Sequence, residues 1–229
     1  QPGASPDGWV VVPDTSDLYV SRWMGGYWLT DTLVDAVDRN DTDMVHIYPG
    51  RDCFVALTGS WAKATDPVVY WNKVRKAYFF YYDGSQWQSE LFFVDSNQIA
   101  FQLCEVVNDA FILGLDYDSV AHGCYFGDSL LMGKYDRDVD SLVTMKVGAN
   151  HYAYSRLPER SALGSDVVMN VYDGNQLDSN LNCVRRDTLR AWKYNYSTYT
   201  WDSCLAYCPG EDWLFDAVTV SSNALHCAV

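Results

Sequence analysis

Between residues 43 and 156, short apolar runs alternate with turn-forming residues, and this pattern constrains the fold more than any other feature of the chain. Pairs such as Pro49-Gly50 and Asp83-Gly84 separate the runs, which recur at intervals of about 8–12 residues. The runs are MVHIY (44–48), CFVALTGSW (53–61), VVYW (68–71), AYFFYY (77–82), ELFFV (90–94), IAFQLCEV (99–106), FILGL (111–115) and SVAHGCYF (119–126). Such spacing is typical of an antiparallel meander in a sandwich or a barrel.

A different pattern follows Pro158. Ser161 or Ser165 can cap the start of a helix, and Asp173-Gly174 can stop it. The apolar residues between them fall on one helical face and are Val167, Val168, Val171 and Tyr172. We therefore predict a helix over about 159–173, followed by one more strand in RAWKYNYSTYTW (190–201).

The charge balance excludes two classes of partner. Sixteen basic and thirty acidic residues give a net charge of −14, which repels nucleic acid and anionic lipid surfaces. No apolar run approaches the roughly 20 residues needed to span a bilayer. We expect neither nucleic-acid binding nor membrane insertion.

The cysteines favour an oxidising compartment. They lack the paired C-x-x-C spacing of a zinc site, so no metal is expected, and the disulfide candidates are Cys53, Cys104, Cys124, Cys183, Cys204, Cys208 and Cys227. Glycosylation candidates are Asn40 and Asn195, and the chain begins at Gln1 without a leader, so we predict a processed, secreted glycoprotein. Seven is odd, so one thiol is left to be buried and inert, to join two chains in a homo-oligomer, or to hold a ligand covalently.

Three motifs occur in a characteristic order. MGGYWLTD (24–31) contains Gly26-Tyr27-Trp28, FILGLDYDSVAHGCYF (111–126) contains Asp116-Tyr117, and HYAYSRLPERSALGSD (151–166) contains Arg156. Together they resemble the motifs of the lipocalin family, although Leu115 stands where the family has threonine. The resemblance implies an all-β fold, an eight-stranded up-and-down antiparallel barrel with one C-terminal α-helix and a ninth strand.

The resemblance also implies a domain plan and structural roles. Residues 1–16 would form a flexible arm, 17–203 the barrel domain, and 204–229 a cysteine-containing extension packed on the barrel. Trp28 would plug the closed end of the barrel, and Arg156 would lie across its indole. By the family's habit, Cys53 would pair with Cys204, Cys208 or Cys227, and Cys124 would also be bonded.

Strand alternation then defines the cavity wall, because residues two apart share a face. If Arg156 and Asp116 point to the closed end, residues at even spacing from them face inward. This spacing gives Ile112, Asn150, Tyr152 and Tyr154, and Tyr125 follows across the turn from Asp116. In AYFFYY either Tyr78, Phe80 and Tyr82 or Phe79 and Tyr81 face inward. With two further aromatic residues, the candidate ligand-binding residues are Trp71, Tyr78, Phe80, Phe101, Ile112, Tyr125, Asn150, Tyr152 and Tyr154. Aromatic walls with phenol groups suit a flat, conjugated molecule.

The function predicted from these features is extracellular binding and transport of a small hydrophobic ligand, of the pigment type that includes bilins, carotenoids and retinoids. No cofactor is required, although a bilin or carotenoid chromophore would be the bound group. We predict no enzyme and no catalytic residue, because the four histidines occur singly and outside known catalytic motifs. The alternatives are a lipocalin-type isomerase or de-epoxidase acting on a lipid-like substrate, and an interaction protein without a ligand.

Overall fold

The computed structural model divides the chain into two compact units, residues 1–101 and 102–229, and each is described by itself. The residues that the structure describes are 3–4, 8–14, 16–37, 44–63, 70–116, 119–121, 124–126, 129–148, 161–164, 166–177, 183–207, 219–221 and 227–228. No helix occurs among them.

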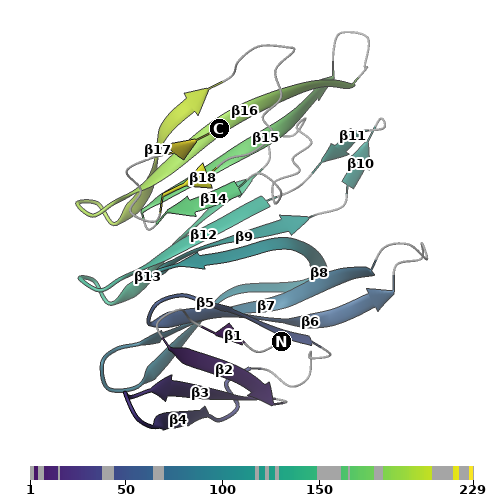
Figure 1. Ribbon diagram of the computed structural model, residues 1–229. Helices are drawn as coiled ribbons and strands as arrows, with labels where there is room; N and C mark the ends of the chain where they lie inside the picture. Colours follow the sequence, from purple (N-terminus) through teal and green to yellow (C-terminus); the bar gives the residue numbers. More distant parts are fainter. Residues whose placement is uncertain are drawn as a thin grey trace. The chain divides into compact units, whose positions relative to one another are not determined.

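Unit 1 consists of two antiparallel meanders (Figure 1). Sheet A is formed, in chain order, by β1 (Gly3–Ala4), β2 (Trp9–Asp14), β3 (Asp17–Trp23) and β4 (Trp28–Leu33). Sheet B is formed by β5 (Met44–Pro49), β6 (Cys53–Lys63), β7 (Tyr70–Tyr82) and the first part of β8 (Trp87–Val107). Strand β8 continues past Phe101 into unit 2.

The core of unit 1 lies between sheets A and B. Its buried side chains are Trp9, Val11, Leu18 and Val20 of sheet A, Ile47, Phe54, Ala56 and Phe80 of sheet B, and Val37 after β4. Phe54 stacks on Phe80 with the ring centres 4.7 Å apart, and the Trp9 indole N–H donates to the carbonyl of Arg51 at 2.6 Å. Each fully buried Val, Leu or Phe stabilises the fold by about 1.5–3 kcal/mol, so this packing fixes sheet A on sheet B.

Unit 2 also contains two larger meanders and two short strand pairs (Figure 1). Sheet C contains the last part of β8, then β9 (Ala110–Asp116), β12 (Ser129–Asp136) and β13 (Ser141–Gly148), hydrogen-bonded in that order, while β10 (Ser119–Ala121) pairs with β11 (Cys124–Phe126). Sheet D contains β14 (Ser161–Gly164), β15 (Val167–Leu177), β16 (Cys183–Asn195) and β17 (Thr200–Tyr207). The last pair is β18 (Thr219–Val220) with β19 (Cys227–Ala228).

Sheets C and D enclose the core of unit 2. Sheet C contributes Ala110, Ile112, Leu130 and Met132, and sheet D contributes Leu163, Val168, Trp192, Tyr194 and Trp201. The Trp201 indole N–H donates to the carbonyl of Val143 at 3.3 Å. Unit 2 therefore repeats the face-to-face packing of unit 1.

The four sheets share a common hairpin. In each one a four-residue loop joins two strands, and the pairs that close the loops are Trp23–Trp28, Tyr82–Trp87, Asp136–Ser141 and Asn195–Thr200. Near each loop an aromatic residue donates its backbone N–H to a backbone carbonyl oxygen at 2.9 Å. The acceptor is the residue directly before the strand that pairs with the first strand of the hairpin. These bonds are Trp23 to Gly8, Tyr82 to Asp52, Tyr135 to Asp109 and Tyr194 to Asp166. The described strands thus form repeated meanders, which were not predicted from the sequence.

The all-β prediction is confirmed, but the predicted barrel is wrong. Every sheet in the described part of the chain has two ends, so none closes on itself. The predicted helix over 159–173 is also wrong, because Ser161–Gly164 and Val167–Leu177 are strands that pair with each other. Three β-branched valines suit a strand better than a helix, and Val168 packs between sheets in the core.

Several predicted boundaries also change. The expected flexible arm, residues 1–16, contains β2, whose Trp9 and Val11 are core residues. The expected ninth strand, 190–201, is instead the turn between β16 and β17 with its flanking residues. Four predicted runs contribute to two strands: Tyr70 and Trp71 of VVYW lie in β7 with AYFFYY, and ELFFV and IAFQLCEV lie in β8.

Candidate interaction surface

Among the described residues of unit 1, sheet A has one face against sheet B and no sheet over its other face. Because Leu18 and Val20 face the core, their neighbours Tyr19, Ser21 and Trp23 point the other way. The cross-strand partners extend this second face over β2 and β4. We call the uncharged part of this face the open face, and its residues are Val10, Val12, Tyr19, Ser21, Trp23, Trp28, Thr30 and Thr32. The next row on the same side, beyond Val12 and Tyr19, is the charged pair Asp14–Asp17.

The open face is ordered in three cross-strand rows. Trp23 pairs with Trp28 at the hairpin end, their rings 5.5 Å apart and inclined at 58°, and each residue is about half exposed, at 50% and 52%. The Ser21 and Thr30 hydroxyls hydrogen-bond at 2.8 Å in the middle row, which also contains Val10. Val12, Tyr19 and Thr32 form the third row.

None of the eight residues carries a charge, although charged residues make up 20% of the chain. The adjoining loop is also uncharged, and its Met24 and Tyr27 are exposed. Gly25 takes a positive φ of 80° in this loop, where Met24 N–H donates to the carbonyl of Tyr27 at 2.9 Å. An exposed surface rich in Trp, Tyr and Met and depleted of charge has the composition of an interface core.

The hairpin below the open face is anchored to sheet B. Arg22 points to the opposite side from Trp23, and its guanidinium carbon lies 3.8 Å from the Tyr82 ring centre and 5.2 Å from that of Trp87. Arg22 Nη2 is also 3.9 Å from a carboxylate oxygen of Asp52. These contacts hold the backbone that displays the two tryptophans.

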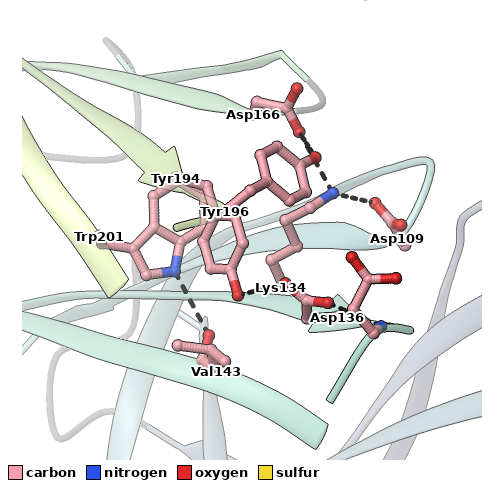
Figure 2. Close-up of polar contacts among 9 residues, drawn as sticks. Asp109, Lys134, Asp136, Val143, Asp166, Tyr194, Tyr196 and Trp201 are labelled. Carbon is pink, nitrogen blue, oxygen red and sulfur yellow. Dashed lines mark hydrogen bonds and ion pairs between the residues drawn. The ribbon is translucent and has the colours of Figure 1, made fainter. Parts of the chain in front are cut away.

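A second cluster, in unit 2, contains charged and phenolic groups (Figure 2). Lys134 on β12 is only 4% exposed, and its ammonium lies 2.6 Å from Asp109 and 3.2 Å from Asp166. Tyr196 donates its hydroxyl to Asp166 at 2.5 Å, and Tyr194 donates to Asp136 at 2.7 Å. These contacts tie sheet C to the β14–β15 turn and to the end of β16.

The pKa shifts of this cluster follow from its pairing. Burial alone would lower the pKa of Lys134, but the hydrogen bond and charge of Asp109, with further charges nearby, raise it above its usual value. Burial and then the Asp136 hydrogen bond raise the pKa of Tyr194, while burial and the Asp166 hydrogen bond raise that of Tyr196 to about 12. Lys134 therefore stays charged and the two tyrosines stay neutral at neutral pH, so we interpret the cluster as a structural contact between the sheets.

The predicted cavity residues do not gather around a hollow where the structure describes them. Phe80 is part of the core of unit 1, with Tyr78 packed against it, while Ile112 is fully buried in the core of unit 2. Trp71, Phe101 and Tyr125 lie in strands, but their side chains are outside the described part, as are residues Asn150, Tyr152 and Tyr154 altogether.

The motif residues are also dispersed. Gly26 and Trp28 belong to the β3–β4 hairpin, and without a barrel Trp28 has no closed end to plug. Asp116 ends β9, while Tyr117 and Arg156 fall outside the described residues.

The predicted modification sites are described only in part. Cys53 and Cys104 are buried, and burial, followed by the charge of Glu105, raises the pKa of the Cys104 thiol. The strands contain Cys124, Cys183, Cys204 and Cys227, whose side chains the structure leaves undescribed, and Cys208 and Asn40 lie outside it. Asn195 lies at the end of β16, and its amide donates to Asp202 at 2.7 Å.

The open face was not predicted from the sequence, although a signal for it is present. Every second residue of LYVSRW and WLTDTL, namely Tyr19, Ser21 and Trp23, then Trp28, Thr30 and Thr32, is uncharged. The residues between them include Arg22 and Asp31.

Two features are absent from the part of the chain that the structure describes. It contains no helix with the length and hydropathy of a membrane span. It also contains no group of three or more His, Cys, Asp or Glu side chains placed to hold a metal ion. No protein-family model, curated protein or solved structure matches the chain.

Proposed function

We propose that this chain is a non-enzymatic binding module that recognises another polypeptide through the open face of sheet A. The observation that carries the proposal is a surface of eight uncharged residues, including Trp23 and Trp28, on a chain with a net charge of −14. Removing such a surface from water is favourable, because each Å² of apolar area contributes about 25 cal/mol.

The shape of the open face favours a polypeptide over a small molecule. It is the face of a sheet, and its ring pair stands on the surface at half exposure, where a partner can cover it. Aromatic side chains anchored in this way are typical of the residues that dominate protein–protein binding energy. A small ligand gains most of its affinity from a concave pocket that surrounds it.

The carrier function expected from the resemblance depended on a hollow barrel, and the described strands do not form one. The interior residues Phe80 and Ile112 fill packed cores, so they do not offer a wall to a pigment. The strongest cluster of titratable groups, around Lys134, is occupied by its own ion pairs, which gives an enzymatic alternative no support. Secretion stays part of the proposal on the ground of the seven cysteines.

Site-specific photo-crosslinking tests the proposal. A benzophenone amino acid replaces Tyr27 beside the open face, and in a matched control it replaces Val139, which is exposed in the β12–β13 loop. After irradiation in an extract of the natural source, we expect a protein adduct from position 27 that position 139 does not give. Equal labelling from both positions, or no adduct at position 27, would refute the proposal.

A further inference from the structure

The described packing follows one rule of orientation in both units. In sheets B and D, the face that carries the hydrogen-bonding aromatic residue, Tyr82 or Tyr194, packs on the preceding sheet. Sheets A and C contribute their other face to these contacts, through Val20 and Met132. The equivalent aromatic residue of sheet A is Trp23, which lies on the open face. In sheets B and D, therefore, the face that corresponds to the open face is the one that packs against another sheet.

The open face is also complementary to itself. Bulky indoles occupy the hairpin end, the Ser21–Thr30 pair occupies the middle, and the opposite end is less bulky, with Val12 and Thr32 beside Tyr19. A two-fold axis through the middle row would place the Trp23–Trp28 end of one copy over the Val12–Thr32 end of the other. Sheets stack face to face at about 10 Å with interdigitated side chains, and two-fold contacts of this kind are the commonest in homo-oligomers.

Charge restricts where two copies can meet. Each chain carries a net charge of −14, so approach through most surfaces opposes carboxylates to carboxylates. The eight residues of the open face carry no charge, and a two-fold axis through the middle row would place the neighbouring Asp14–Asp17 pair over the uncharged 24–27 loop of the other copy. We infer that the occupant of the open face is a second copy of this chain, docked through its own open face; this inference rests on the proposed function and names its partner.

Analytical ultracentrifugation of the full chain tests the inference. We expect a concentration-dependent monomer–dimer equilibrium, and we expect added salt to strengthen the dimer because it screens the repulsion between the two acidic copies. The variant Ser21→Arg brings two cations together near the axis, and we expect it to weaken the dimer by about a hundredfold or more. The matched control Val139→Arg adds the same charge in the exposed β12–β13 loop and should leave the dimer unchanged.

Thr30→Lys on the edge strand β4 provides a second variant whose folding is not threatened, because Thr30 is exposed. A wild-type chain that stays monomeric at every concentration and salt level would overturn the inference. So would a Thr30→Lys chain that dimerises as tightly as the wild type. If the chain is monomeric but position 27 crosslinks to a different protein, the inference fails while the proposed function stands; if neither occurs, both fail.

Discussion

The guanidinium carbon of Arg22 lies over the Tyr82 ring, 3.8 Å from its centre, and links the hairpin of sheet A to the hairpin of sheet B. The two residues are 60 positions apart and belong to equivalent turns of consecutive meanders. The contact explains how an exposed tryptophan pair is held in place: Trp23 and Arg22 are neighbours that point to opposite faces.

Arg22→Ala should lower the free energy of unfolding by about 1–2 kcal/mol, because the cation–π contact and the packing of the side-chain stem are lost. Arg22→Met should recover at least half of this loss, since the stem still covers Tyr82 and no guanidinium donor is left without a hydrogen bond. Urea denaturation of the three chains measures both effects. Equal stability of the alanine variant and the wild type would show that the contact does not anchor the hairpin.

Gly133→Ala should destabilise unit 2 by about 1–3 kcal/mol. A Cβ at this position of β12 would lie 2.5 Å from the buried Phe111 ring, so the ring or the strand has to move. Gly26→Ala is the control, because a Cβ there meets nothing within 4 Å and its φ is not positive. Thermal unfolding by circular dichroism should separate the two variants; a Gly133→Ala chain as stable as Gly26→Ala would contradict the packing described.

The Lys134 cluster predicts a loss of stability at alkaline pH. The pKa of Lys134 is raised on folding, and that of Tyr196 is raised to about 12, so the folded chain binds more protons than the unfolded chain above about pH 10. The contribution of Lys134 and Tyr196 to the free energy of unfolding is fully present below about pH 10. It is lost as the pH rises through the pKa values of the two groups in the folded chain. Urea titrations between pH 8 and about pH 11 should show falling stability, with a shallower slope for Tyr196→Phe. Identical slopes for the two chains would exclude this role for Tyr196.

Trp28→Ser should leave the stability of the monomer within about 0.5 kcal/mol of the wild type, because the indole is half exposed. Trp9→Ser should instead prevent stable folding of unit 1, since Trp9 is buried between the sheets and bonds to Arg51. Urea unfolding followed by far-ultraviolet circular dichroism compares the two. A large loss of stability in Trp28→Ser would mean that the residue is part of a core.

The strands could be predicted from the sequence because alternation and turn residues are local signals. Asp83-Gly84 does form a turn, and Gly84 has the positive φ of 105° that glycine permits. Barrel closure could not be predicted in this way, because it depends on pairing between residues far apart in the chain. The motif Gly26-Tyr27-Trp28 is too short to determine that pairing, and here it forms the end of a hairpin loop.

The helix error and the missed repeat have particular causes. The spacing of Val167, Val168 and Val171 fits one helical face, but pairing with β16 and burial of Val168 decide in favour of a strand. The repeat was visible in Asp52, Asp109 and Asp166, which are 57 residues apart and each precede an apolar run. Without the structure, nothing indicated that these aspartates occupy equivalent positions.

Hydroxyl-radical footprinting of the wild-type chain across a dilution series tests the claim of binding through the open face most directly. In dilute solution Trp23 and Trp28 should be oxidised readily, while the buried Trp9 and Trp201 are protected. At high concentration Trp23 and Trp28 should become protected, while the exposed Tyr196 of unit 2 stays as reactive as before. Oxidation of Trp23 and Trp28 that does not change with concentration, or protection that develops at Tyr196 instead, would contradict the account.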